Sequence, residues 1–113
     1  APAGEGLGMA AFSRTSWRNR SAYYDVYVRD EYATRDCLRA AYELTVAFGF
    51  DELNLYRSTV RVSSDATDVH SVLIDLGAQR EAVLRQHAMR DGTPEDLFVF
   101  GILRRDFAGE RVP

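Results

Sequence analysis

The chain has 113 residues, 46% of them apolar and 12% aromatic, which is enough for one globular domain with a modest hydrophobic core. The formal net charge is −3 and charges of both signs are mixed along the chain, so a surface that binds nucleic acid or an anionic membrane through bulk charge is not expected. The one cysteine, Cys37, excludes an internal disulfide, and no apolar run approaches the roughly 20 residues of a membrane span. We therefore expect a cytoplasmic protein without a membrane or nucleic-acid partner.

The first predicted elements are two strands joined by a turn. Residues 1–6 are rich in Pro and Gly and predict a flexible lead. The apolar run 7–13 predicts a strand, the polar residues 17–21 a turn, and the β-favouring segment 22–29 a second, antiparallel strand. Alternation in the second strand places four side chains on one face: Tyr23, Asp25, Tyr27 and Arg29.

The middle of the chain predicts two helices on either side of a third strand. Apolar residues recur at helical spacing over 33–48, and Gly49 is placed to end that helix. Alternation over 53–62 predicts the strand. A second helix is predicted over 65–76, capped by the Asp at its start and ended by Gly77.

The last part of the chain predicts a hairpin. Strands over 81–89 and 95–104 flank the segment 90–94, in which Asp-Gly followed by Pro is a strong turn signal. The predicted order is β-β-α-β-α-β-β. The fold class is therefore α/β, with a mixed, mainly antiparallel sheet of about five strands and two helices.

Three stretches resemble the GNAT superfamily of N-acetyltransferases, particularly its ribosomal-protein and diamine acetyltransferase branch. Residues 48–57 are similar to the family's passage from helix into strand, residues 75–85 to its "Leu-Gly-Phe, x, x, Glu-Gly, x, x, Arg" segment, and residues 91–104 to its closing hairpin. The resemblance implies a GNAT-like domain over 7–107, followed by a tail over 108–113.

The resemblance also implies that the domain is truncated. A full GNAT domain begins with a strand, two helices and another strand that precede the segment matched here, and those elements build much of the acceptor side. Without them, the strand 7–13 lies at an open edge, which natural proteins normally cover. We therefore expect a homodimer, or a second chain, that covers this edge.

The positions that hold acetyl-CoA in the family carry unusual residues here. The family binds the pyrophosphate on a Gly-rich turn that opens the first long helix. This chain places Val28 at the family's Gln/Arg position and Glu31 at its central glycine, and only Ala33 matches. The cofactor-binding candidates that remain, if CoA is bound, are Arg35 and Arg39.

The family's catalytic positions are changed as well. Tyr23 aligns with the carboxylate that often serves as base, and Ala66 and Val69 align with the Asn and Ser of the family's "Asn-x-x-Ser". Neither Ala nor Val donates a proton or a hydrogen bond. We therefore expect no bound cofactor, with acetyl-CoA or another acyl-CoA as the alternative.

No metal site is predicted, because His70 and His87 lie 17 residues apart without other ligands at suitable spacing. Cys37 lies near the start of the first predicted helix. A buried, inert thiol is the favoured interpretation, and a stabilised thiolate is the alternative.

The cleft between the second and third predicted strands takes the pantetheine arm in the family. It supplies the candidate site here, with Tyr23 and Asp25 as candidate acid–base residues. The candidate residues for binding a small-molecule or acyl ligand are Tyr27, Arg29, Tyr56 and Arg61, with Arg57 as an alternative to Tyr56. The alternative is that half of these candidate cleft residues pack beneath the helices.

Three functions remain open from the sequence. The first is a small biosynthetic enzyme that uses the former pantetheine cleft on an acyl or peptidyl intermediate. The second is a non-catalytic GNAT-like subunit for binding or assembly. The third is an acetyl-CoA-dependent N-acetyltransferase.

Overall fold

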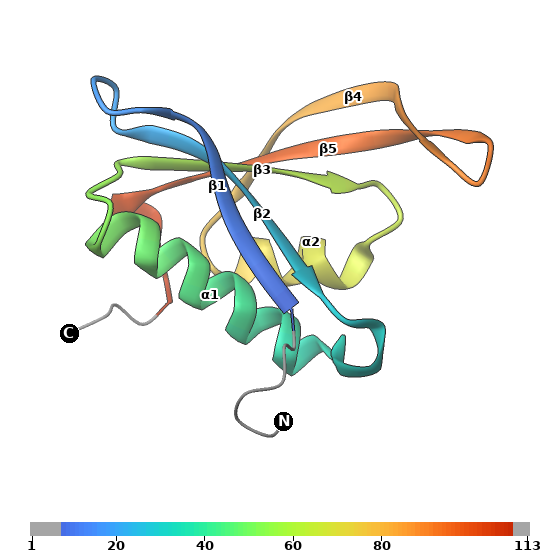
Figure 1. The fold of residues 1–113 in the computed structure, drawn as a ribbon, viewed down its shortest axis with the longest axis horizontal. Helices are drawn as coiled ribbons and strands as arrows, with labels where there is room; N and C mark the ends of the chain where they lie inside the picture. Colours follow the sequence, from blue (N-terminus) through green and yellow to red (C-terminus); the bar gives the residue numbers. More distant parts are fainter. Residues whose placement is uncertain (1–7, 110–113) are drawn as a thin grey trace.

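The computed structural model describes residues 8–109, so the predicted lead over 1–6 and most of the predicted tail lie outside the described residues. Five strands form one sheet and two α-helices cover it, which confirms the predicted α/β class and element order (Figure 1). In chain order the elements are β1 Gly8–Ser16, β2 Ser21–Val28, α1 Arg35–Asp51, β3 Arg57–Ser63, α2 Thr67–Asp75, β4 Gln79–Arg90 and β5 Thr93–Leu103. Within residues 8–109, neither helix combines the length and the apolar character needed to traverse a bilayer.

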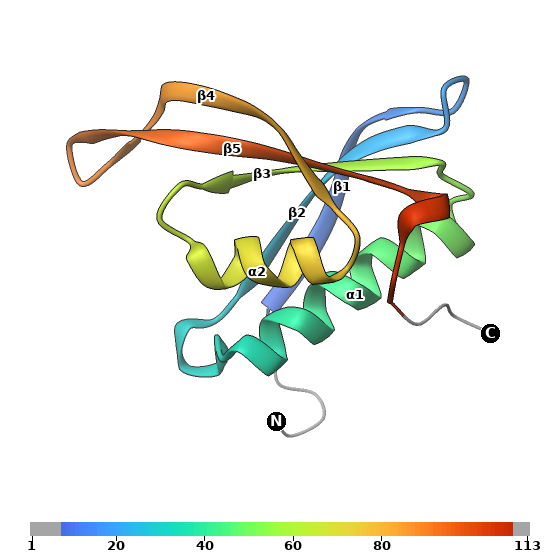
Figure 2. The same cartoon turned by 180° about the vertical axis from the view of Figure 1, so that it is seen from behind.

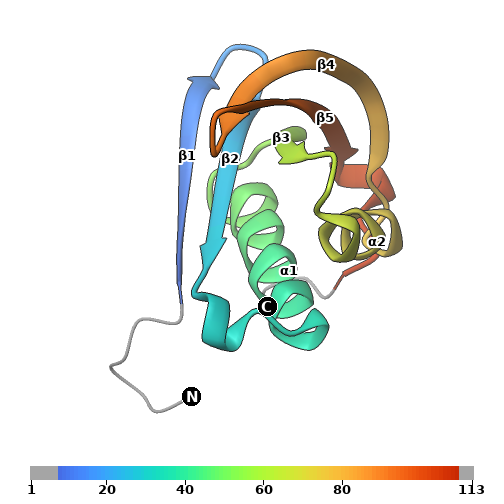
Figure 3. The same ribbon diagram turned by 90° about the vertical axis from the view of Figure 1, so that its right-hand side faces the viewer.

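The sheet has the strand order β1-β2-β3-β5-β4. Every neighbouring pair is antiparallel except β2 and β3, which are parallel and are connected through α1. Both helices lie on the same face of the sheet, side by side (Figures 2 and 3). The opposite face carries no helix among the described residues, and we call it the helix-free face.

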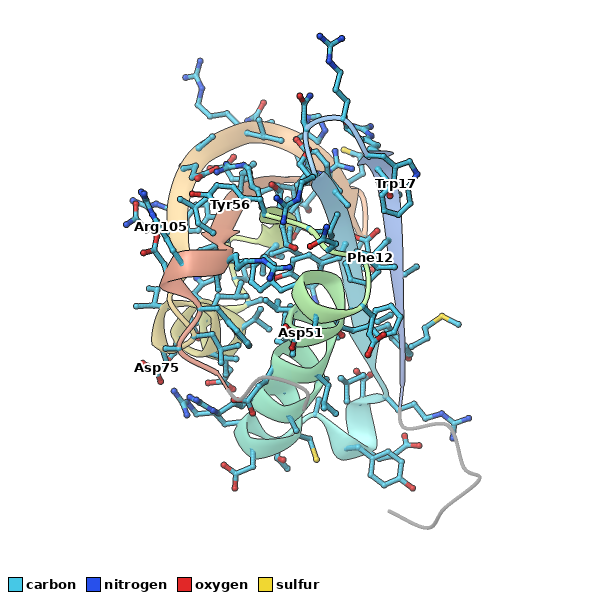
Figure 4. The ribbon with its side chains drawn as sticks, turned by 90° about the vertical axis from the view of Figure 1, so that its left-hand side faces the viewer. Phe12, Trp17, Asp51, Tyr56, Asp75 and Arg105 are labelled. Atoms are coloured by element: carbon cyan, nitrogen blue, oxygen red, sulfur yellow. The ribbon has the colours of Figure 1, made fainter. Side chains whose placement is uncertain are left out.

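The core lies between the helices and the sheet. On β2, Ala22 and Tyr24 are buried beneath α1, whereas Tyr27 is 58% exposed, so the predicted alternation is confirmed. Tyr24 packs edge-on against Tyr42 of α1, and Phe12 of β1 also packs against Tyr24. Phe12 points toward α1, whereas Trp17 in the β1–β2 connection points away from it (Figure 4). Aromatic packing therefore fastens the β1–β2 pair to α1.

Helix α1 begins after Thr34, whose Oγ1 accepts a hydrogen bond of 3.2 Å from the Cys37 N–H. The prediction that Gly49 ends this helix is wrong, because the helix continues to Asp51. Gly49 is buried, and a Cβ there would lie 3.1 Å from the Phe12 ring and 3.2 Å from the Leu55 side chain. The glycine permits close packing inside the helix rather than ending it.

Strand β3 begins four residues later than predicted, at Arg57, because the preceding backbone bonds elsewhere. The Arg104 guanidinium donates to the carbonyl of Leu55 at 3.0 Å and to the carbonyl of Phe50. Leu55 is fully buried in this loop, so it contributes to the core without belonging to a strand.

The predicted cap of α2 is also displaced. Ala66, not Asp65, occupies the N-cap position, and no side chain caps the helix there. Gly77 does end α2, since its φ of 103° is a conformation that favours glycine. The hairpin turn is confirmed as well, with Asp91 and Gly92 at φ of 51° and 79° joining β4 to β5.

Strand β1 is the edge of the sheet and pairs only with β2 within residues 8–109. Three large apolar side chains near this edge are exposed: Met9 at 73%, Leu44 at 66% and Phe48 at 46%. An apolar groove of about 330 Å³ runs between the two strands and α1. The homodimer or second chain expected here stays a prediction.

Ser58 offers a test of the core. Its side chain is fully buried on β3, and its Oγ is the buried side-chain atom within residues 8–109 that lacks a hydrogen-bond partner. A buried unpaired hydroxyl costs about 1–3 kcal/mol, so Ser58→Ala should raise the free energy of unfolding by about 1 kcal/mol in urea denaturation. The matched change Ser63→Ala should lower it, because the Ser63 hydroxyl bonds Glu95 and the Asp65 N–H. Lower stability in both variants would refute the assignment.

The open edge predicts association. In sedimentation experiments the chain should have a mass above the 12.7 kDa of one copy, alone or with its partner. Met9→Arg and Leu44→Arg place charge on the exposed apolar surface and should shift the mass toward that of one copy without changing the circular dichroism spectrum. A monomer that stays soluble at high concentration, without a partner, would contradict the prediction.

Candidate functional site

The candidate site begins where β2 and β3 separate. The two strands pair at only three positions, and the last pair is Tyr23 with Thr59. Beyond it β2 continues beside β1 to Val28, and β3 continues beside β5 to Ser63. Figure 3 shows the two strands diverging with α1 beneath them. The facing edges of β2 and β3 therefore offer backbone N–H and C=O groups that do not pair with one another.

The start of α1 lies at the far end of β2 and is acidic. A single 3-10 turn over Asp30–Tyr32 precedes the helix, and Arg29 pairs with Glu31 at 3.8 Å. Asp36 adds a further carboxylate in the first turn of α1. Since carboxylates stabilise a helix N-terminus themselves, this end of α1 is less favourable for a phosphate than the glycine-rich turn of the resemblance.

The two arginines proposed to hold CoA are paired with carboxylates. Arg35 donates to the Asp75 carboxylate at 2.5 Å and to the Ser71 hydroxyl at 2.9 Å, which joins α1 to α2. Arg39 lies 3.8 Å from Glu43 on the next turn of α1. Both guanidinium charges are therefore largely balanced within the fold.

A hollow on the helix-free face lies beside the last β2–β3 pair. It has a volume of about 180 Å³, and Arg14, Tyr23, Arg57, Thr59 and Glu81 are among its lining residues. We call it the arginine hollow. The guanidinium carbons of Arg14 and Arg61 lie 5.4 Å and 5.7 Å from the centre of the Tyr23 ring. Cation–π attraction holds both arginines over the tyrosine.

Glu81 reaches the arginine hollow from β4 and pairs with Arg57. It does so by crossing β5 at Gly101, where a Cβ would lie 2.5 Å from its carboxyl atoms. The sequence predictions named Arg57 as an alternative to Tyr56, and they missed Arg14 and Glu81 as site residues. A glycine in an otherwise apolar strand was the signal for this close approach.

The structure separates the other predicted cleft residues from the arginine hollow. Asp25 shares the helix-free face with Tyr23 and is exposed. Tyr27 follows on that face and borders the apolar groove beside α1. Arg29 lies past the end of β2, whereas Tyr56 lies before the start of β3, beside Arg20. Because β2 and β3 are parallel, Arg29 and Tyr56 lie at opposite ends of the cleft, so the prediction that one cleft gathers them is corrected.

The other residues considered from the sequence are His70, His87 and Cys37. His70 Nε2 lies 2.8 Å from the Ser63 carbonyl oxygen, and its ring packs on Phe98 and Phe100. His87 is exposed on β4, and no group of three metal-ligating side chains occurs within residues 8–109. Cys37 is half-buried at the apolar groove rather than in the core.

Two tyrosines beneath the cleft have raised pKa values. Burial, and then the Asp25 charge, raises the pKa of Tyr42 to about 12. Burial, and then Tyr42, raises the pKa of Tyr24 well above its ordinary value. Both phenols therefore stay protonated at neutral pH and cannot act as phenolate bases.

Comparisons with known proteins find sequence relatives of the chain. The chain is 28% identical over 98 residues to an uncharacterised N-acetyltransferase YoaA of Bacillus subtilis (strain 168), covering 87% of the chain and 55% of the relative. It is 32% identical over 69 residues to an uncharacterised N-acetyltransferase p20 of Bacillus licheniformis, covering 61% of the chain and 39% of the relative. The chain thus spans about half the length of these relatives, or less. No protein-family model matches it.

Solved structures show the same fold. A probable acetyltransferase superposes with a TM-score of 0.78 at 22% identity, over 89% of the chain and 57% of that protein. A variant of the spermidine N-acetyltransferase SpeG from Vibrio cholerae superposes with a TM-score of 0.78 at 20% identity, over 86% and 57%.

Proposed function

We propose that the chain forms part of an acetyl-CoA-dependent N-acetyltransferase, because it has the fold of solved acetyltransferases and its sequence relatives are named N-acetyltransferases. The observation that carries the proposal is the separation of β2 from β3 after three residue pairs. The comparisons favour this function over the biosynthetic enzyme with an acyl or peptidyl substrate that was the first expectation from the sequence.

The cleft fits the acyl-pantetheine arm of such a donor. The arm contains amide groups, and the facing edges of β2 beyond Tyr23 and of β3 beyond Thr59 offer the complementary backbone groups. When bound, acetyl-CoA supplies a thioester whose carbonyl carbon accepts an amine and whose thiolate leaves. The backbone of β2 and β3 would bind and orient the arm. This binding does not depend on side chains in the cleft.

Asp25 and Tyr23 are the chain's candidates for handling the acceptor's proton. Both lie on the helix-free face, beside or just beyond the point where the strands separate. Asp25 is exposed, so its carboxylate is open to an incoming amine. We assign Asp25 as the base that removes the amine proton and Tyr23 as a positioning residue at the mouth of the cleft.

Two measurements test acetyl-CoA as the donor and Asp25 as the base. Calorimetric titration with acetyl-CoA should give a dissociation constant in the micromolar range. Asp25→Asn should lower kcat for CoA release by about a hundredfold, because it removes the proton acceptor, while leaving acetyl-CoA affinity unchanged. Asp91→Asn in the β4–β5 turn is the matched control and should retain activity. Failure to bind acetyl-CoA would refute the proposed function.

The acidic start of α1 favours a second candidate, a non-catalytic GNAT-like module that binds a partner. Asp30, Glu31 and Asp36 oppose the pyrophosphate, and the Thr34 hydroxyl already occupies the Cys37 N–H. In this case the frame of the fold is retained without transfer chemistry.

Glu31→Gly separates the two candidates. It removes one carboxylate and restores the small residue of the family's turn, so acetyl-CoA affinity should rise about two- to fivefold if the pyrophosphate lies at the start of α1. Glu52→Gln, beyond the other end of α1, makes the same charge change and should leave affinity unchanged. If neither the parent chain nor Glu31→Gly binds acetyl-CoA, the binding module is favoured.

A further inference from the structure

The arginine hollow carries cationic charge that the fold does not balance. Arg57 is paired with Glu81. Within residues 8–109, neither Arg14 nor Arg61 lies within ion-pair distance of a carboxylate. The excess charge therefore belongs to the two arginines that flank the Tyr23 ring.

These two arginines are held in place without being neutralised. Arg14 comes from the irregular end of β1, where its φ of 49° turns the chain, and Arg61 comes from β3. They meet over one tyrosine of β2, so three strands build the arrangement. A cation–π contact fixes a guanidinium but leaves its N–H donors available. Two such donors beside a hollow form a suitable receptor for a carboxylate, because guanidinium and carboxylate groups match in geometry.

The hollow lies on the same face as Asp25, the proposed base, which is the face from which an acceptor would reach the cleft under the proposed function. It adjoins the Tyr23–Thr59 pair, at which the cleft begins, and it lies on the face that carries Asp25. In an extended strand, side chains two residues apart are separated by about 7 Å, so Tyr23 with its arginines and Asp25 form neighbouring positive and negative positions.

We infer that the acceptor is a small amine that also bears a carboxylate, of amino-acid type, whose carboxylate is bound by Arg14 and Arg61 above Tyr23. This deepens the proposed function and rests on it for the identity of the reacting amine. A simple polyamine lacks the carboxylate and would place cationic charge against two arginines, which is unfavourable. The chain thus differs in acceptor class from the spermidine N-acetyltransferase whose fold it shares.

The test uses pairs of amines that differ only by the α-carboxylate: ornithine against putrescine, and phenylalanine against phenethylamine. Each is titrated into the 113-residue chain while the Nε–H signals of Arg14 and Arg61 are followed by NMR. The amino acids should shift both signals and bind at least about tenfold more tightly than the matched amines. Arg61→Gln should remove that difference, whereas Arg85→Gln, on the exposed part of β4, should preserve it.

Equal or tighter binding of the amines, or no shift of the two arginine signals with any probe, would overturn the inference. A separate acetyl-CoA titration distinguishes this result from failure of the proposed function. If acetyl-CoA does not bind but ornithine shifts the signals of Arg14 and Arg61, the carboxylate site stands and acetyl transfer does not. If acetyl-CoA binds and putrescine is acetylated faster than ornithine, acetyl transfer stands and the carboxylate site does not.

Discussion

The structure depends on one constraint, which is that β2 and β3 are held by different partners. Beyond Tyr23, β2 stays with β1 and with α1, because Tyr24 packs against both Phe12 of β1 and Tyr42 of α1. Strand β3 stays with β5 over its whole length. Bringing the strands together beyond the third pair would require one of these packed units to move, and close-packed interiors resist such movement. The cleft therefore results from the packing of β2 with β1 and α1 and from the pairing of β3 with β5.

The two faces of the sheet carry different kinds of side chain. The helix-facing side is filled by aromatic and aliphatic residues and includes tyrosines that remain neutral at ordinary pH. The helix-free side, around the same three residue pairs, carries charged groups from three strands, β1, β3 and β4. An acyl donor between the strands would thus meet its acceptor on the charged side, with no helix of the described residues in the way.

The ends of the cleft differ in charge. The arginine hollow lies where the strands begin to separate, and the acidic turn with Glu31 lies at the other end, before α1. An anionic donor at α1 and a cationic acceptor would call for basic residues at the start of α1 and acidic residues at the hollow. This chain has the opposite distribution of charge. This distribution motivates both the second candidate function and the inference about a carboxylate-bearing acceptor.

The sequence by itself determined the element order, the alternation of β2, the hairpin turn at Asp91-Gly92 and the resemblance to GNAT acetyltransferases, because these follow from local periodicity, turn chemistry and short motifs. It misjudged Gly49, since a glycine that ends a helix and one that admits a neighbouring ring are alike in sequence. Of the candidate site, sequence reasoning named Tyr23, Asp25 and Arg61 but grouped them with Arg29 and Tyr56. Only the tertiary structure decided that Arg14, Arg57 and Glu81 line one hollow, because that arrangement depends on sheet register, a strand irregularity and the passage of Glu81 over Gly101.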